Sequence, residues 1–450
     1  MGMDLRFGRI LLGWAMVILV GPGLTGAAEA LGDPLAWAVQ ITDQLRAGRF
    51  QEVEARFDPA LAAALPPGQL AVVWASLEAQ LGPLQAVGEA FVAGEEPVVQ
   101  VRQPATFAGG EVDLLYAFDD RGRLAGFWVV PRQDPPGEAQ ADASPPPYAD
   151  PSRFVEVEVT VGQPPYELPG TLTLPRGEGP FPGVVLVHGS GPQDRDERIG
   201  PNRPFRDLAW GLATRGIAVL RYDKRTFVHG PRLDPTQVTL EDEVVADALA
   251  AVELLAGRPE IGPIYLAGHS LGGTLAPVIA RRAPELAGVI LLAPMARPVS
   301  QVLPEQLAYL AQVDGQVTPE EEAQVEAFRT ALAQAVSGAV APEAMILGAP
   351  AAYWQELDAL DPVAVARELE LPMLVLQGGR DYQVTEADFR RFQAGLASRA
   401  GVQFHLFPEL NHLFMVGTGP SHPGEYEDPG HVAPEVVETI ARWITHLSRR

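Results

Sequence analysis

The chain has 450 residues, of which 47% are hydrophobic and 20% are charged, and this composition is typical of a globular protein with room for one large domain and a smaller one. Its formal net charge of −24 repels phosphate backbones and argues against nucleic-acid binding. The chain contains no cysteine, so disulfides, a thiolate nucleophile, cysteine-ligated metal and a lipid-modified cysteine anchor are excluded.

Residues 1–30 have the pattern of a secretory signal peptide. Two arginines precede an apolar run at 10–20, and small residues follow up to Ala-Glu-Ala at 28–30. The segment is also nearly long enough to act as an uncleaved membrane anchor. The Gly-Pro break after the apolar run comes early for an anchor, which favours cleavage. Under either interpretation, we expect the bulk of the chain to be exported, to the periplasm or outside the cell.

Residues 31–130 are predicted to form a small α+β domain. An Asp-Pro start at residue 33 introduces one helical pattern, and residues 67–82 carry a second that a Gly-Pro pair ends. Apolar runs separated by glycine-rich turns then predict two or three antiparallel strands up to residue 130. No motif in this domain has a chemical reason behind it. We expect Trp74 and Trp128 to belong to its core.

Residues 131–152 are rich in proline, alanine and aspartate and show no apolar period, which predicts a semi-stiff linker. The pattern changes at residue 153, where the catalytic domain is expected to begin and to continue to residue 450. Residues 153–161 alternate strictly between apolar and polar, as in a half-buried strand, and residues 167–175 are expected to pair with them.

Continuous apolar runs then alternate with helical patterns. The six runs cover residues 183–189, 216–223, 263–269, 288–294, 372–379 and 402–408. Runs of this kind are buried on both faces, so they predict a mostly parallel sheet with helices on both sides. The last residues, 434–450, are predicted to form a closing amphipathic helix.

One connection is too long for an ordinary crossover. About 75 residues separate the runs at 288–294 and 372–379. Residues 300–313 and 318–336 in this interval have helical patterns, and the second begins with a Thr-Pro cap signal. We therefore predict a helical lid over about 296–365, inserted at the edge of the sheet.

The segment Gly-His-Ser-Leu-Gly-Gly at 268–273 lies directly after a predicted strand and directly before a predicted helix. A tight turn of this kind holds Ser270 in a strained backbone conformation, and only glycines can pack beside it. The turn would expose the serine oxygen above the sheet, with the Leu271 amide at the helix start aimed at the same point. We interpret Ser270 as a nucleophile in preference to a structural turn residue.

A serine nucleophile needs a base, and the base needs an orienting acid. Asp381 follows the apolar run at 372–379, within a glycine-rich turn, and is the predicted acid. Its alternative role is that of a turn-forming or helix-capping aspartate. Asp358 and Asp361 are rival acids, but they precede the strand on the lid side.

His412 lies in the loop after the last predicted strand and is the predicted base. His405 lies inside that strand and is expected to be packed. His422 and His431 belong to a loop that no strand holds in place. His269, beside the nucleophile, is expected to pack or orient neighbouring groups.

The negative charge that develops during attack on a carbonyl requires hydrogen-bond donors. The turn after the run at 183–189 supplies the amide of Ser190, or alternatively that of Gly191, to act with the Leu271 amide. His188 in the same turn is expected to organise the loop. The charged residues 194–198 that follow either line the entrance of the cleft or form a solvated loop.

With these motifs in order, residues 153–450 resemble the α/β-hydrolase superfamily. The segments at 188–197, 202–226, 268–273, 378–385 and 410–414 together resemble the EstD-like bacterial esterases, which are related to dienelactone hydrolases and serine oligopeptidases. The first domain is similar to a small domain of unknown function that precedes such hydrolases. The resemblance implies a triad of Ser270, Asp381 and His412, and these positions do not depart from the family pattern.

These expectations converge on a serine carboxylesterase that cleaves short- to medium-chain acyl esters through an acyl-enzyme, without a metal or organic cofactor. Two other functions remain open. The same triad could serve an exported serine peptidase, with the acidic residues after the oxyanion turn holding a peptide amino terminus. Alternatively, the first domain could be an envelope-binding module that carries the hydrolase domain as a secondary part.

Overall fold

The computed structural model describes residues 18–19, 33–65, 67–94, 99–108, 110–132, 144–313 and 315–449. The chain forms two compact units. The first holds residues 1–142 with the short segments 231–236 and 347–349, and the second holds residues 143–230, 237–346 and 350–450. Most of the predicted signal segment, residues 1–30, lies outside the described residues. No helix of the described residues is long and apolar enough to cross a bilayer.

The first unit combines short helices with an antiparallel sheet. Its helices are α2 (Pro34–Arg46), α3 (Phe50–Glu54), α4 (Pro59–Ala64) and α5 (Gln69–Leu81). Its strands are β1 (Ile18–Leu19), β2 (Leu84–Val87), β3 (Phe91–Gly94), β4 (Val99–Phe107), β5 (Gly110–Phe118) and β6 (Leu124–Pro131). The strand order is β1-β6-β5-β4-β2, and β3 also pairs with β4.

Local sequence explains where these helices begin, because Asp33 accepts a hydrogen bond from the Leu35 amide ahead of α2, and Asp58 accepts one from the Leu61 amide ahead of α4. Trp74 and Trp128 are both buried, as expected of core residues.

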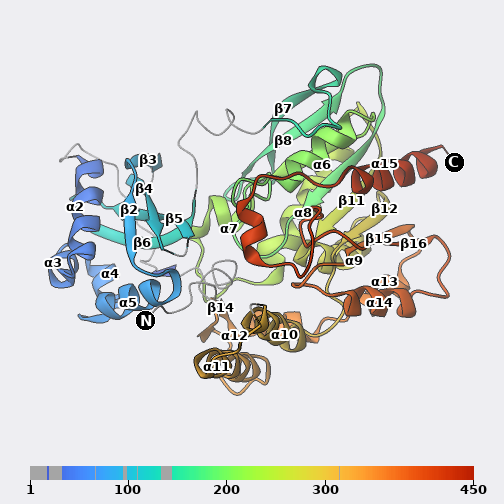
Figure 1. The fold of residues 1–450 in the computed structure, drawn as a ribbon. Helices are drawn as coiled ribbons and strands as arrows, with labels where there is room; N and C mark the ends of the chain where they lie inside the picture. Colours follow the sequence, from blue (N-terminus) through green and yellow to red (C-terminus); the bar gives the residue numbers. More distant parts are fainter. Residues whose placement is uncertain are drawn as a thin grey trace. The chain divides into compact units, whose positions relative to one another are not determined.

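The second unit is built on a sheet of eight strands in the order β16-β15-β12-β11-β9-β10-β8-β7 (Figure 1). The strands are β7 (Phe154–Val161), β8 (Leu168–Pro175), β9 (Phe181–Val187), β10 (Ala218–Tyr222), β11 (Ile261–His269), β12 (Leu286–Leu292), β15 (Met373–Gly378) and β16 (Val402–Phe407). The six strands from β9 onward are parallel, and β7 and β8 form an antiparallel hairpin that joins at β10. This confirms the predicted mostly parallel sheet.

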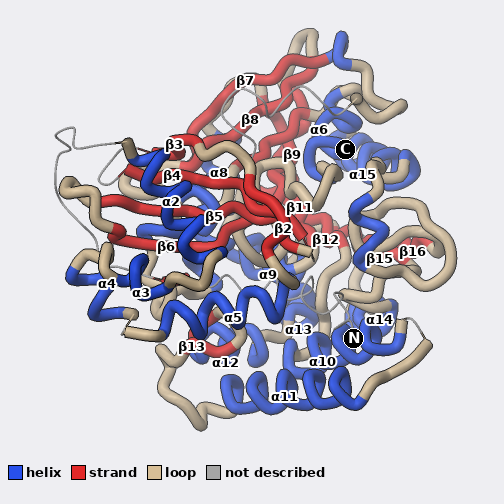
Figure 2. The backbone as a smooth tube through the Cα atoms, turned by 60° about the vertical axis from the view of Figure 1, so that its left-hand side comes forward, coloured by secondary structure: helices blue, strands red, loops and turns tan. Residues whose placement is uncertain are grey.

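Helices cover both faces of this sheet (Figure 2). On one face, α6 (Pro204–Ala213) and α15 (Pro434–Ser448) share a core with alternate strand residues such as Val184 and Leu186. The residues between them, such as Val185, point to the other face because side chains alternate along a strand. There α8 (Ala246–Ala256) and α9 (Leu271–Arg282) pack against β9, β11 and β12.

The interval between β12 and β15 is the predicted helical insertion. It contains α10 (Val299–Gln312), α11 (Pro319–Val336), the short pair β13 (Met345–Ile346) and β14 (Ala349–Pro350), α12 (Ala351–Ala359) and α13 (Pro362–Glu368). The start of α11 is a capping box, in which Thr318 and Glu321 satisfy each other's backbone amides. Sequence patterns predicted α10 and α11 but not the shorter α12 and α13, whose apolar residues span too few turns to show a period.

Several short elements complete the unit. They are η1 (Pro151–Arg153), α7 (Arg225–Val228), η3 (Glu241–Val245), α14 (Glu386–Gly395) and η4 (Pro423–Glu427), while η2 (Gly230–Arg232) leads into the segment 231–236 of the first unit. Of these, η3 is a π-helical turn that leads directly into α8.

Candidate active site

Ser270 occupies the sharp turn between β11 and α9. Its backbone has φ 52° and ψ −116°, a conformation that side-chain-bearing residues rarely adopt. The Ser270 amide donates to the Leu292 carbonyl at 2.8 Å, which ties the turn to the neighbouring strand β12. A residue with this local strain at the carboxyl end of a buried strand is displayed above the sheet.

The glycines around the serine are required by close backbone approach. A β-carbon at Gly268 would lie 2.2 Å from the Gly272 carbonyl oxygen, and one at Gly272 would lie 2.3 Å from the Val187 carbonyl oxygen. Both distances are far below van der Waals contact, and the clashing atoms belong to the backbone. The turn therefore packs directly against the end of β9, as the glycine spacing predicted.

Asp381 and His412 meet in a buried pair. His412 Nδ1 lies 2.7 Å from Asp381 Oδ2, and both side chains are almost completely buried. The same Asp381 oxygen accepts a hydrogen bond from Gln377 Nε2 at 3.0 Å. The other Asp381 oxygen accepts from the amides of Gln383 and Val384 at 2.8 and 3.0 Å. The carboxylate is thus fixed from several sides and offers one acceptor to the imidazole.

The loop that carries His412 is held in shape by its neighbour Asn411. The Asn411 side-chain oxygen accepts from the amides of Leu413 and Met415, both at 3.1 Å. A β-carbon at Gly378 would lie 2.5 Å from the Asn411 carbonyl oxygen, so the glycine that ends β15 lets this loop approach the acid. Sequence reasoning assigned no role to Asn411, and its approach to Gly378 depends on two loops meeting in space.

Ser270 and His412 belong to the same site but are not joined by a hydrogen bond between their side chains in the described part of the chain. His269 connects them instead: it precedes Ser270, its ring centroid lies 4.7 Å from that of His412, and its Nε2 lies 3.0 Å from the His412 carbonyl oxygen. The structure therefore joins the predicted acid and base directly, and brings the predicted nucleophile near through its neighbour.

The predicted oxyanion turn lies beside the serine. A β-carbon at Gly189 would be 3.2 Å from Ser270 Cβ. The Gly189 amide donates to Glu197 Oε1 at 2.7 Å, and the Gly191 amide donates to Glu243 Oε1 at 2.9 Å. Within the described residues, the amides of Ser190 and Leu271 have no hydrogen-bond partner. Of the two amides considered for this turn, Gly191 is thus occupied and Ser190 is available.

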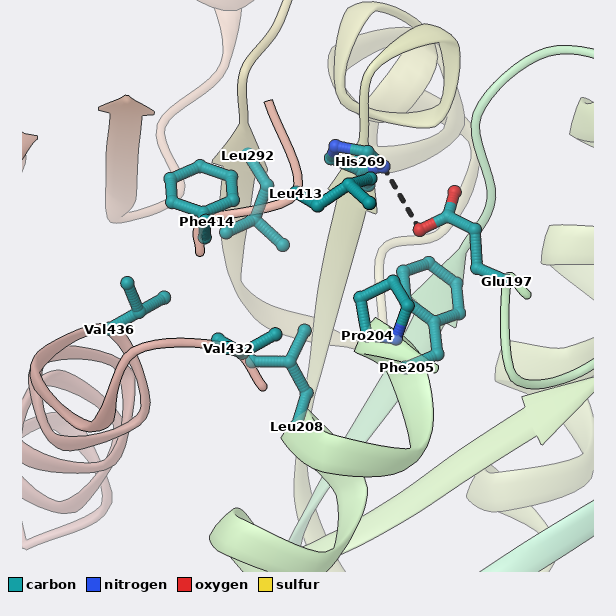
Figure 3. Close-up of a pocket in the computed structure, with 10 residues that line it drawn as sticks. All are labelled: Glu197, Pro204, Phe205, Leu208, His269, Leu292, Leu413, Phe414, Val432 and Val436. Carbon is teal, nitrogen blue, oxygen red and sulfur yellow. Dashed lines mark ion pairs between the residues drawn. The ribbon is translucent and has the colours of Figure 1, made fainter. Parts of the chain in front are cut away.

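Glu197 and His269 form a second buried pair behind the serine, at the edge of a small and otherwise apolar cavity (Figure 3). His269 Nδ1 and Glu197 Oε2 are 2.9 Å apart, without the alignment of a regular hydrogen bond. The other ring nitrogen faces the carbonyl oxygen of His412, and a carbonyl can only accept. With an acceptor at each nitrogen, the imidazole is best satisfied when it is doubly protonated.

Electrostatics agree with this assignment. Burial opposes charge on His269, but the Glu197 carboxylate outweighs burial and raises the pKa of His269 above its usual value. Burial also opposes charge on Glu197, yet the nearby His269 charge holds the pKa of Glu197 below its usual value. His269 therefore orients neighbouring groups, as expected, and its contacts and its raised pKa both favour the imidazolium form.

The remaining histidines take other roles. His188 Nε2 lies 2.9 Å from the Asp194 carbonyl oxygen, and burial lowers the pKa of His188 to about 3, so this ring organises the loop as a neutral group. His405 was expected to be packed, and this is wrong: the side chain is exposed, because β16 is an edge strand with one face turned to solvent. His422 precedes η4, and His431 pairs with Asp207 at 3.1 Å.

The rival acids are structural. Asp358 accepts a hydrogen bond from the Ser300 amide at 2.8 Å, and Asp361 caps α13 through the Ala364 amide at 3.0 Å.

The charged run at 194–198 is tied into the fold by internal partners and is not a solvated loop. Asp194 accepts from the amides of Asp196 and Arg198, both at 3.1 Å, and burial together with the Asp196 charge raises the pKa of Asp194 to about 7. Arg195 pairs with Asp223 at 3.0 Å, and Asp196 pairs with Arg221. These ion pairs hold the loop against the sheet. Sequence spacing did not predict them, because the partners are distant in the chain.

Sequence reasoning did not predict that Glu197, Glu243 and Lys224 contact the turn at 189–191. Lys224 Nζ donates to the Gly189 carbonyl oxygen at 2.7 Å and to Glu243 Oε1 at 2.8 Å. One signal was present in the sequence, because Lys224 is its only lysine. Within the described residues, no group of three histidine or carboxylate side chains is placed to bind a metal.

Comparisons with known proteins found matches over most of the chain. Residues 184–418 match the family model of the serine aminopeptidases, S33, and residues 38–127 match a domain family of unknown function. Esterase EstD of Thermotoga maritima is 42% identical over 380 residues, which cover 83% of this chain and 86% of the relative.

Among solved structures, the chain matches Est1E from Butyrivibrio proteoclasticus at 17% identity and a TM-score of 0.43, covering 65% of this chain and 99% of that one. An esterase of Pyrobaculum calidifontis has 18% identity and a TM-score of 0.43, covering 65% of this chain and 86% of that one. The identity to Esterase EstD over most of both chains, together with the family match across the catalytic domain, shows that this chain belongs to the EstD-like family of α/β-hydrolases.

Proposed function

We propose that this protein is a serine carboxylesterase. Ser270 attacks the ester carbonyl while His412 accepts its proton, and Asp381 holds the imidazole with Nδ1 protonated so that Nε2 is free to act as the base. The amides of Ser190 and Leu271 stabilise the oxyanion. The alcohol leaves with the proton from His412, and water then hydrolyses the acyl-enzyme by the same route.

One observation carries this proposal: the buried Asp381–His412 pair, at 2.7 Å, lies in the site whose strained turn displays Ser270. The acid and the histidine are 31 residues apart in the sequence and come from loops after different strands. A helix cap or packed histidine would not require this convergence. Membership in the EstD-like family supports ester hydrolysis as the reaction.

The peptidase alternative would need a free carboxylate near the turn to hold a peptide amino terminus. Asp194 is engaged by backbone amides, Asp196 by Arg221, and Glu197 by His269 and the Gly189 amide. Each of these carboxylates therefore already has a partner inside the fold. This favours the esterase over an aminopeptidase, and the inserted helices favour short or medium acyl chains over bulk lipid.

A fluorophosphonate probe and a panel of p-nitrophenyl esters test the proposal on wild type and Ser270→Ala. We expect the probe to label wild type alone and kcat to fall by roughly 10⁵-fold or more in the variant, since the triad acts as a unit. Labelling of Ser270→Ala would place the nucleophile elsewhere. Faster turnover of aminoacyl p-nitroanilides than of p-nitrophenyl butyrate would support the peptidase instead.

We also propose that the chain is exported and that residues 1–30 are removed. Two arginines, an apolar run and an Ala-Glu-Ala site support this, as argued from the sequence.

A further inference from the structure

The only lysine of the chain is buried beside the oxyanion turn. The Lys224 side chain is 2% exposed and that of its partner Glu243 is 7% exposed. A buried ion pair is expensive to desolvate, and apolar residues of similar volume are often equally stabilising or more so. A contribution to stability therefore explains the pair poorly. Its contacts with the turn suggest a role in position.

The pair fixes the backbone on both sides of Ser190. Lys224 donates to the Gly189 carbonyl oxygen at 2.7 Å, and Glu243 Oε1 accepts from the Gly191 amide at 2.9 Å. Lys224 Nζ and Glu243 Oε1 are themselves 2.8 Å apart, so their two contacts with the turn are coupled. A displacement of Lys224 would rotate the peptide group that contains the Ser190 amide, and a displacement of Glu243 would rotate the next one.

Glu243 is presented to the turn by an unusual piece of backbone. It lies in the π-helical turn η3, Glu241–Val245, which precedes the regular helix α8. Such turns are rare, and they frequently occur at functional sites because the extra residue re-aims a side chain.

The second oxygen of Glu243 is bound by the insertion. Tyr353 on α12 donates its hydroxyl to Glu243 Oε2 at 2.7 Å, and this tyrosine is buried. Burial and the neighbouring Glu243 carboxylate raise the pKa of Tyr353 well above its usual value, so the hydroxyl stays a donor. An unbroken line of hydrogen bonds thus runs from the inserted helix α12 to both sides of Ser190.

We propose that Lys224 and Glu243 are positioning residues of the oxyanion turn. Tyr353 couples the position of this pair to the position of the inserted helices. The inference rests on the proposed function, since it assumes that the Ser190 amide stabilises an oxyanion. It goes further by linking the insertion to the transition state. The insertion then sets the rate of the chemical step as well as covering the site.

The test compares Tyr353→Phe with a matched control, Tyr309→Phe. Tyr309 lies on the inserted helix α10 and donates its hydroxyl to the Ser421 carbonyl oxygen at 2.8 Å, so the control loses the same group from the same insertion. In full-length protein with titrated active sites, we expect Tyr353→Phe to lower kcat for p-nitrophenyl butyrate about tenfold with KM nearly unchanged, less than the direct loss of an oxyanion donor. Tyr309→Phe should stay within about twofold of wild type.

A second measurement separates position from stability. An alkyl trifluoromethyl ketone adds reversibly to a serine nucleophile, and the resulting oxyanion needs the same donors. Its inhibition constant should rise in Tyr353→Phe by the factor by which kcat/KM falls, whereas a structural role would lower Tm and leave the constant unchanged. Glu243→Gln should show the same correspondence with a larger change, because Lys224 then lacks a charged partner.

Wild-type kcat and inhibition constant in both Tyr353→Phe and Glu243→Gln would overturn the inference, as would a change in KM alone. Failure of the proposed function looks different. Ser270→Ala would then keep its activity, whatever the tyrosine variants do.

Discussion

Glu197 holds two parts of the active site from one position. One carboxylate oxygen accepts from the Gly189 amide at 2.7 Å, and the other lies 2.9 Å from His269 Nδ1. Its own backbone has φ 53°, a left-handed conformation that disfavours residues with a side chain. Such strain persists where the surrounding structure over-determines it. The two contacts of the Glu197 side chain account for this backbone strain. His269 in turn contacts the carbonyl oxygen of His412.

This pair should depend on pH in a defined direction. The folded pKa of His269 is raised, so its stabilising effect is complete below the unfolded value of about 6.5 and is lost as pH rises through the folded pKa. The folded pKa of Glu197 is lowered, so its effect is complete above the unfolded value and is lost at acid pH. The carboxylates of Glu197 and Asp381 and the rings of His188 and His412 face His269.

We therefore expect Glu197→Gln to lower Tm by about 5 °C at pH 6, and by less as pH rises toward 9. Differential scanning calorimetry across this range provides the measurement. Glu305→Gln is the control, because it removes an exposed carboxylate whose partner, Arg297, stays charged between pH 6 and pH 9. A Tm difference for Glu197→Gln that stays constant or grows with pH would show that the imidazolium assignment is wrong.

At the scale of elements, the site depends on how closely four strand ends approach one another in two pairs. The turn after β11 packs on the carbonyls at the end of β9, and the turn after β15 packs on the loop that follows β16. Each approach needs a glycine, because a β-carbon would meet backbone that cannot move aside. The turn around Ser270 is therefore part of the packing of the sheet as well as part of the chemistry.

Gly272→Ala should accordingly be destabilising by roughly 3 kcal/mol or more, since its β-carbon would lie 2.3 Å from the Val187 carbonyl oxygen. Chemical denaturation followed by tryptophan fluorescence measures this. Gly257→Ala is the matched control: Gly257 ends α8 with φ −79°, and a β-carbon there would meet atoms only at 3.7 Å. We expect the control to be within about 1 kcal/mol of wild type. Equal stability of the two variants would contradict the packing argument.

At the scale of the molecule, the strand order brings the site together. The sheet grows outward in both directions from β9, with β10 on one side and β11 on the other. The turns after β9 and β11 therefore diverge at a switch point, and such points are where open α/β sheets bind ligands. Because the strands are parallel, the loops after β15 and β16 reach the same edge.

The whole chain also carries the proposed export signal. We expect protein made from the full-length gene in a bacterial host to be released from the cell or periplasm with Leu31 as its first residue. Intact-mass measurement and N-terminal sequencing check this. Recovery of the uncleaved chain with the membrane fraction would favour the anchor described above.

The sequence by itself was enough to predict a mostly parallel sheet with helices on both faces, the helical insertion and the candidates Ser270, Asp381 and His412, and the family resemblance added the α/β-hydrolase fold. These follow from local signals: apolar runs buried on both faces, caps, and a glycine-flanked serine between strand and helix. Short elements such as α12 and α13, and the exposure of His405 on an edge strand, did not follow, because they depend on neighbours that are distant in the chain.

Only the tertiary structure showed that Glu197, Lys224 and Glu243 hold the oxyanion turn. A carboxylate in the sequence is most often solvated, and no period or spacing marks one that is buried against a backbone amide. Its partners are set by which loops meet at the end of the sheet. Hydrogen bonds and ion pairs act over a few ångströms in space, and separation along the chain does not determine that distance.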